Sequence, residues 1–460
     1  MLPAERIDEL VQIEKGRIDI SLYRDEEIFE QELQRIFYTT WVYVGHTSEI
    51  AETGDYKTSY IGRIPVILSR DENGEIHVLI NRCAHRGPTV CQQEYGNANF
   101  FRCEYHGWVF GNDGSLAGVS LRRGFGPGEI DDIQGGLDKA PRVGIYRGLV
   151  FASLAPEGPT LEEHLGLARQ YLDDWADRSP TGEVMLAGGY AKHTYVGNWK
   201  LQLEGSNEGY HAPFLHRISG YVSEKVAELG GRSRYGNATR GGAGLGPTAV
   251  SAGIDLGNGH SVMGSGLNPD AWKGYPTEYT DKLRNRLGQE RMEDVLGSGW
   301  RMQLFPNAAF SSDNLRVIRP ITPTLTEVLQ WVVLLPEVPD VMNTNRIRGE
   351  QHFYGAAGYG ATDDIEMFAR MFEGYRSSDY KNLNQWALFS RGQTFEKQGP
   401  NGEKFAHVTT EVEQRAIYYA YRSLMKGESH ITAVDPAAMP TAQAARQVAT
   451  KMSGQTVTEA

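Results

Sequence analysis

The spacing of apolar residues divides the chain into a strand-like part and a more helical part. The segments IPVILSR (64–70) and IHVLIN (76–81) have the apolar, β-branched character of strands. Between them, Asn73-Gly74 favours a tight hairpin turn. Further strand-like segments with turn signals follow. Residues 41–154 are therefore predicted to form a small antiparallel β domain.

Helical spacing of apolar residues dominates elsewhere. Thr160 begins the capping-box pattern Thr-Leu-Glu-Glu, which predicts a helix start. Helices are predicted near 25–37, 160–177, 199–215, 364–376 and 410–425, with paired strands near 309–336. This pattern indicates an α+β domain after the β domain. The predicted organisation is an N-terminal helical segment (1–40), the β domain (41–154), the α+β domain (155–434) and a C-terminal tail (435–460).

Composition narrows the class of protein. The 460 residues carry 46 basic and 58 acidic side chains, a net charge of −12 that argues against nucleic acid or an anionic membrane as the main partner. No apolar run approaches the ~20 residues of a membrane span. The N-terminus lacks the apolar core of a signal peptide. We therefore expect a cytoplasmic protein, whose thiols stay reduced and available to metals.

The three cysteines all lie within residues 81–111, NRCAHRGPTVCQQEYGNANFFRCEYHGWVFG. Cys83, His85, Cys103 and His106 have the spacing C-x-H-x17-C-x2-H. Two thiolates and two imidazoles suit a tetrahedral zinc ion. They equally suit a [2Fe–2S] cluster in which the cysteines hold one iron and the histidines the other.

The spacing and the flanking residues favour the cluster. Cys-x-His is tighter than the gaps usual in zinc sites. Gly87 and Gly107 follow the histidines and permit tight turns. The stretches CAHRG and CEYHGW are similar to the Rieske cluster motif. Cys91 lies outside both pairs and is interpreted as a packed thiol.

A second group of candidate ligands lies in GNWKLQLEGSNEGYHAPFLH, residues 197–216. Glu208 and His211 are three residues apart and would share a face of a helix. His211 and His216 would point roughly 140° apart on a regular helix. Pro213 between them is expected to break the helix and bring them together. Two imidazoles and a carboxylate would then complete a facial triad for non-heme Fe(II).

The carboxylate is predicted in GYGATDDIEMF, residues 358–368. Asp363 and Asp364 stand at a predicted helix start. Asp363 could instead be a cap or a first-turn acid that stabilises the helix, and both roles are possible in one pair.

The chain from about 25 to 430 resembles the large (α) subunit of Rieske non-heme iron ring-hydroxylating oxygenases, most closely the benzoate, anthranilate and salicylate branch. The stretches that carry this resemblance are CAHRG, CEYHGW, GNWK…E…GYH…H, LFPNAAF, RVIRPI and TDDIEMF. It implies an all-β Rieske [2Fe–2S] domain and a helix-grip-like catalytic domain, an antiparallel sheet flanked by helices, on which the N-terminal segment packs. It also implies that His211, His216 and the second aspartate of the pair, Asp364, bind the iron, with Asp363 as the alternative.

Two positions depart from the family pattern. The family usually has an aspartate where this chain has Glu208; that aspartate links the ligand histidine of one subunit to a cluster histidine of its neighbour. Glu208 would accordingly join His211 to His106, or to His85, of another chain. Gly205 stands where an asparagine is common, so any role of that amide is absent or filled by another group.

The resemblance implies that O2 is activated with electrons from NAD(P)H, delivered by a separate reductase and in some systems a ferredoxin. The sequence shows no flavin or NAD motif of its own; GGAGLG at 241–246 lacks the flanking strand and helix. The substrate would be an aromatic carboxylate, and the assembly α3 or α3β3. Candidate pocket walls are Leu203, Asn207, Phe214, Leu215, Tyr221, Val222, Met263, Leu304 and Phe310. The alternatives are an N- or O-demethylase, an electron carrier without oxygenase activity and a zinc-stabilised binding protein.

Overall fold

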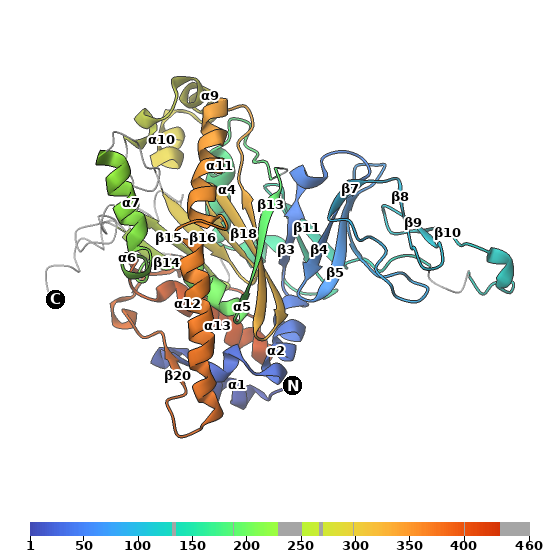
Figure 1. Cartoon of the computed structure of the whole chain (residues 1–460), viewed down its shortest axis with the longest axis horizontal. Helices are drawn as coiled ribbons and strands as arrows, with labels where there is room; N and C mark the ends of the chain where they lie inside the picture. The colour runs from blue at the N-terminus through green and yellow to red at the C-terminus, as the bar shows by residue number, and fades with distance from the viewer. Residues whose placement is uncertain are drawn as a thin grey trace. The chain divides into compact units, whose positions relative to one another are not determined.

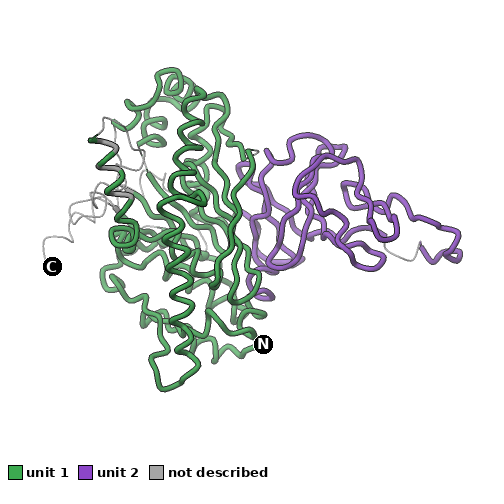
Figure 2. The backbone as a smooth tube through the Cα atoms, in the orientation of Figure 1, with its two compact units in different colours: residues 1–32, 162–460 green, residues 33–161 purple. Residues whose placement is uncertain are grey.

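The computed structural model of the chain describes residues 1–130, 135–186, 188–228, 251–265, 270–297, 299–399 and 401–432. The tail predicted at 435–460 and the segment 241–246 lie outside these described residues. The chain divides into two compact units, residues 1–32 with 162–460 and residues 33–161 (Figure 2). Among the described helices, none is both long and apolar enough to cross a bilayer.

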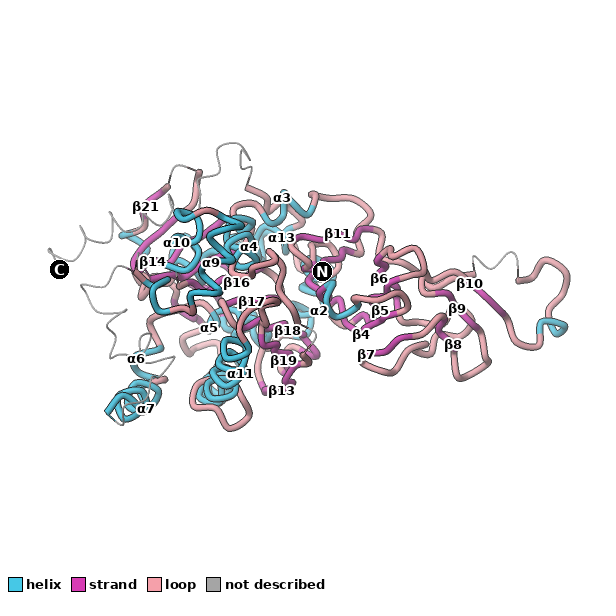
Figure 3. The backbone as a smooth tube through the Cα atoms, turned by 90° about the horizontal axis from the view of Figure 1, so that it is seen from above, coloured by secondary structure: helices cyan, strands magenta, loops and turns pink. Residues whose placement is uncertain are grey.

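The smaller unit, residues 33–161, contains short strands joined by loops (Figure 3). They form antiparallel sheets in the orders β6-β5-β4-β7, β11-β12-β3 and β10-β9-β8. Arg70 pairs with Ile76 at the hairpin around Asn73-Gly74, as predicted. The strands are β3 Val42–His46, β4 Asp55–Ile61, β5 Ile64–Arg70, β6 Ile76–Ile80, β7 Tyr95–Asn97, β8 Phe100–Arg102, β9 Val109–Gly111, β10 Leu116–Gly118, β11 Arg142–Tyr146 and β12 Leu149–Ser153.

The larger unit is built around a long antiparallel sheet (Figure 1). Within the described residues its nine strands follow the order β13-β19-β18-β17-β16-β15-β14-β22-β21. These strands are β13 Tyr190–Val196, β14 Ser251–Gly257, β15 His260–Ser265, β16 Trp300–Leu304, β17 Ala308–Ser311, β18 Asn314–Thr322, β19 Leu325–Val332, β21 Lys397–Gln398 and β22 Lys404–His407. A small sheet, β1-β2-β20, joins β1 Val11–Gln12, β2 Arg17–Asp19 and β20 Trp386–Leu388.

Helices cover both faces of the long sheet (Figure 3). Trp175 of α4 packs on Phe310 with ring centroids 5.5 Å apart, which places α4 on one face. Phe368 of α12 packs on Tyr195 at 5.2 Å on the opposite face, which we call the α5 face because α5 also packs there. The helices are α1 Ala4–Leu10, α2 Glu26–Glu32, α3 Leu161–Leu165, α4 Ala168–Asp177, α5 Trp199–Ser206, α6 Ala212–Leu215, α7 Arg217–Glu228, α9 Thr277–Leu287, α10 Gln289–Gly297, α11 Asp340–Tyr354, α12 Ala361–Gly374 and α13 Val412–Lys426. The α+β class and the antiparallel sheet flanked by helices are confirmed.

The single helix predicted over 199–215 is wrong. Asn207 (φ −137°, ψ 63°) ends α5, and its side chain donates to the Ser261 hydroxyl on β15 at 2.9 Å. Glu208 and His211 therefore lie in a non-helical turn and do not share a helical face. Pro213 does not cause the break, because it stands in the first turn of α6, where proline fits well.

A buried ion pair holds α5 against α2. The Lys200 ammonium lies 2.5 Å from the Glu32 carboxylate, and both side chains are fully buried. Trp199 and Tyr421 donate hydrogen bonds to the same carboxylate at 2.7 and 2.8 Å. Burial lowers the pKa of Lys200, while Glu32 acts in the opposite direction. The ammonium therefore depends on Glu32 to remain charged inside the protein.

Replacing Glu32 with Gln should lower the free energy of unfolding by about 3–5 kcal/mol, because Lys200 would be left buried without a counter-charge. Equilibrium urea unfolding measures the loss. The control, Glu366→Gln, breaks the exposed i,i+4 pair with Arg370 and should cost less than about 1 kcal/mol. Equal losses in the two variants would contradict the role assigned to the buried pair.

Candidate metal centres

Two loops of the smaller unit share one backbone geometry. The Gly87 N–H donates to the Cys83 carbonyl at 3.0 Å, and the Gly107 N–H donates to the Cys103 carbonyl at 2.9 Å. Each cysteine N–H donates to the carbonyl five residues later, at 2.9 and 2.8 Å. Both glycines have positive φ, 85° and 70°, which a residue with a Cβ adopts at a cost. The two loops thus turn in the same way, although the histidine stands two residues after Cys83 in one loop and three residues after Cys103 in the other.

The side chains of these loops converge. Cys83 and Cys103 are free thiols, 3% and 1% exposed. Burial raises the pKa of the Cys83 thiol, and the neighbouring Cys103 thiol adds to the effect. The rings of His85 and His106 lie 4.6 Å apart, and Trp108 stacks on His85 at 4.9 Å. Among the described residues, the buried Nδ1 of His85 has no hydrogen-bond partner. Two sulfur and two nitrogen donors in this arrangement fit a [2Fe–2S] cluster.

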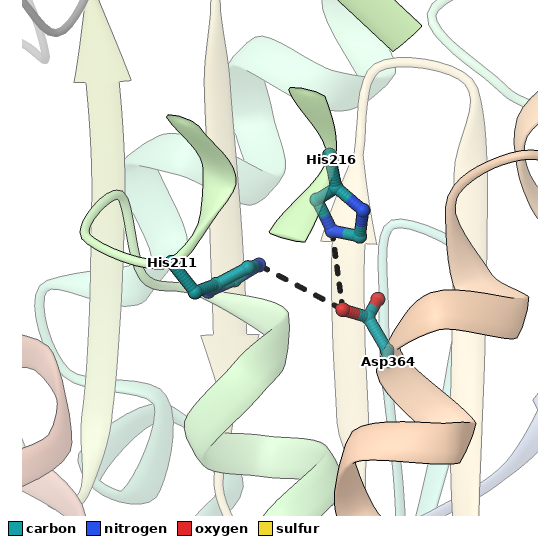
Figure 4. Close-up of side chains that lie close together, drawn as sticks. All are labelled: His211, His216 and Asp364. Atoms are coloured by element: carbon teal, nitrogen blue, oxygen red, sulfur yellow. Dashed lines mark ion pairs between the residues drawn. The ribbon is translucent and has the colours of Figure 1, made fainter. Parts of the chain in front are cut away.

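A second group of ligand atoms lies in the larger unit (Figure 4). The Asp364 carboxylate, in the first turn of α12, lies 3.8 Å from His211 Nε2 and 3.1 Å from His216 Nε2. One donor atom of each residue lies within 4.8 Å of the other two. Asp363 approaches the other nitrogen of His216, Nδ1, at 3.8 Å, and its side chain is 36% exposed. Asp364 is thus the member of the pair that faces both imidazoles.

Glu208 fixes the orientation and tautomer of His211. One carboxylate oxygen accepts the His211 backbone N–H at 2.8 Å, and the other contacts Nδ1 of the same residue. A carboxylate only accepts, so Nδ1 carries the hydrogen and the Nε2 lone pair faces Asp364. Burial lowers the pKa of His211, but Glu208 and then Asp364 outweigh it and raise that pKa. The field that favours a protonated imidazole also favours a metal cation.

Two of the predicted pocket walls, Phe310 and Leu304, lie on the face of the sheet that α4 covers. Phe310 packs on Trp175 on the α4 side of the sheet, so its prediction as a pocket wall is wrong. Leu304 shares that side, because it stands two residues from Met302, the direct partner of Phe310. Helices cover both faces of the sheet, and apolar side chains are buried on each. Apolar character in the sequence therefore could not show which of the two faces a residue lies on.

Two polar residues of β16, Arg301 and Gln303, were missed by the sequence analysis. Their even spacing puts them together on the α5 face, opposite Met302. The charge of Arg301 reaches His211, where it opposes protonation. The alternation within WRMQL was a visible signal, but it does not say which face of the strand lies near the histidines.

Comparisons with known proteins agree with both centres. The family description "Rieske [2Fe-2S] domain" matches residues 40–124, and "Ring hydroxylating alpha subunit (catalytic domain)" matches residues 183–425. The large subunit of anthranilate 1,2-dioxygenase from Acinetobacter baylyi is 34% identical over 395 residues, covering 82% of this chain and 80% of that protein. That of 2-halobenzoate 1,2-dioxygenase from Burkholderia cepacia is 31% identical and covers 83% and 81%.

A solved structure shows the same arrangement of elements. Naphthalene 1,2-dioxygenase from Rhodococcus sp. bound to indole superposes with a TM-score of 0.79 and 27% identity, covering 93% of this chain and 98% of that one. The two family matches span the residues of the two donor sets described above. The chain therefore belongs to the α subunits of Rieske ring-hydroxylating oxygenases, which combine a [2Fe–2S] domain with a mononuclear iron catalytic domain.

Proposed function

We propose that this chain is the terminal oxygenase that hydroxylates or cis-dihydroxylates the ring of an aromatic carboxylate. The observation that carries the proposal is the presence of two donor sets of different chemistry in one chain, Cys2His2 and His2Asp. Two similar proteins act, by their names, on anthranilate and on a 2-halobenzoate, which are both aromatic acids. A separate NAD(P)H-dependent reductase, with or without a ferredoxin, would supply the electrons.

We assign the cluster to Cys83, His85, Cys103 and His106, and the mononuclear Fe(II) to His211, His216 and Asp364. When bound, the cluster supplies single electrons and the ferrous ion offers open positions to O2. The chain's own contribution is geometric. Glu208 holds the proton at Nδ1 of His211 and so leaves Nε2 available as a ligand atom.

Glu208 also bears on how the α subunits would assemble. Glu208 is 15% exposed at its side chain, and we propose that it also reaches His106 of the partner subunit in an α3 or α3β3 assembly. The extra methylene of glutamate, relative to the aspartate usual in the family, lengthens this bridge. A cluster would then serve the iron of a neighbouring subunit.

Replacing Cys83 with Ser should abolish the cluster, because a serine hydroxyl stays protonated where a thiolate binds iron. The loss would appear as missing visible absorption and missing acid-labile sulfide. Cys91→Ser is the matched control, since the Cys91 thiol is also buried but directs its hydrogen to the Gln93 carbonyl at 3.7 Å. If Cys91→Ser lost the cluster and Cys83→Ser kept it, the assignment would be wrong.

Asp364→Ala should lower the iron content from about three to about two atoms per chain, because it removes one ligand of the mononuclear site and none of the cluster. Asp363→Ala should retain about three. Iron analysis, with the cluster spectrum as a reference for folding, separates the two outcomes. The reverse pattern would make Asp363 the ligand.

Glu208→Gln should retain both metals and lose at least about 10-fold of the product rate, since the uncharged amide has one acceptor oxygen where the carboxylate accepts both the backbone N–H and the Nδ1–H of His211. Glu208→Asp should keep much of the activity. The assay is turnover of benzoate, salicylate and anthranilate with reductase, ferredoxin and ¹⁸O2. Demethylation of a methylated analogue such as N-methylanthranilate, without ring hydroxylation of any of these acids, would favour a demethylase. That alternative is relevant because the α subunit of an N,N-dimethyl phenylurea N-demethylase from Sphingobium is 30% identical over 76% of this chain.

A further inference from the structure

Strand β16 presents two hydrogen-bonding side chains to the α5 face of the sheet. Arg301 and Gln303 are two residues apart and therefore point the same way. Gln303 pairs directly with Ser261 of β15, whose hydroxyl accepts a hydrogen bond from Asn207 at 2.9 Å. Asn207 ends α5 and directly precedes Glu208. The two β16 side chains consequently share the sheet face that lies under the end of α5.

The side-chain amide of Gln303 is a buried hydrogen-bond donor for which the described part of the chain offers no acceptor. Gln303 is 1% exposed, and its side-chain Nε2 has no hydrogen-bond partner among the described residues. On β17 its neighbour is Ala309, which has no polar atom beyond Cβ to offer. An unsatisfied buried amide destabilises the protein unless something else accepts its hydrogens. A ligand with an acceptor oxygen would satisfy it.

Arg301 supplies positive charge at the same place. The side chain is half-buried, and its charge acts on His211. The other charges near that imidazole, Glu208 and Asp364, are both negative. The charge of a bound ferrous ion would only balance these two carboxylates, so a further cation on this face would be needed to attract an anionic substrate. A guanidinium can bind a carboxylate through two parallel hydrogen bonds.

We propose that Arg301 and Gln303 form the subsite for the carboxylate group of an aromatic acid. The guanidinium neutralises and orients the carboxylate, and the Gln303 amide donates one further hydrogen bond. The aromatic ring then lies on the side of His211, His216 and Asp364. The inference rests on the proposed function and adds to it the residues that select an acid over a neutral ring.

The test uses the metal-loaded oxygenase and two ligands of similar shape, benzoate and neutral benzamide. Isothermal titration calorimetry should show benzoate binding weakened about 10- to 100-fold in Arg301→Gln, the loss expected for a charge-assisted hydrogen bond. Benzamide should change by less than about 3-fold, and Arg301→Lys should lie between wild type and Arg301→Gln, since a lysine keeps the charge. Gln303→Leu should weaken benzoate by about 5-fold, the scale of a neutral hydrogen bond. Arg370→Gln, which removes one exposed positive charge from α12, is the matched control and should leave benzoate binding unchanged.

Equal weakening of benzoate and benzamide in Arg301→Gln, or no weakening of either, would overturn the subsite. Failure of the wild type to bind benzoate while it oxidises toluene would also overturn it, yet leave ring hydroxylation in place. Arg301-dependent benzoate binding without any ring-hydroxylated product would support the subsite and refute the proposed function.

Discussion

The contact between Glu208 and His211 determines which imidazole nitrogen the larger unit offers to a metal. The carboxylate takes both the backbone N–H and Nδ1 of His211. Only Nε2 is then left to face Asp364. This contact needs α5 to end at Asn207, because in a continued helix the His211 backbone N–H would donate to the Asn207 carbonyl instead of to the Glu208 carboxylate. The end of α5 at Asn207 is therefore a requirement of the site.

The start of α5 is held as firmly as its end. Lys200 is paired with Glu32 inside the protein, and one turn later Glu204 accepts a hydrogen bond from Tyr23 at 2.9 Å and another from Tyr418. Burial raises the pKa of Glu204 to about 7, although the two tyrosines act against this shift. Buried polar groups are costly unless each has its partners, so the helix has one favourable position. That position places Glu208 beside His211, one of the proposed iron ligands.

The sequence was most informative where the chemistry is local. The Cys83 and Cys103 loops are short, place a glycine four residues after each cysteine and need only their own backbone to form, so their turns were predictable. The helix break was not predictable, because the Asn207 side chain finds its partner on β15, 54 residues away. Arg301 was missed for the same reason, since its relation to His211 depends on the pairing of β15 with β16. The choice between Asp363 and Asp364 required the orientation of α12.

We propose that one chain holds two iron centres of different donor chemistry. Mössbauer spectroscopy of the protein loaded with ⁵⁷Fe can distinguish them, because sulfur-bound and nitrogen/oxygen-bound iron give distinct spectra. We expect about two-thirds of the iron in a [2Fe–2S] cluster and about one-third as high-spin ferrous iron with nitrogen and oxygen ligands. A spectrum with all of the iron in one environment, or a protein that holds zinc in place of the cluster, would contradict it.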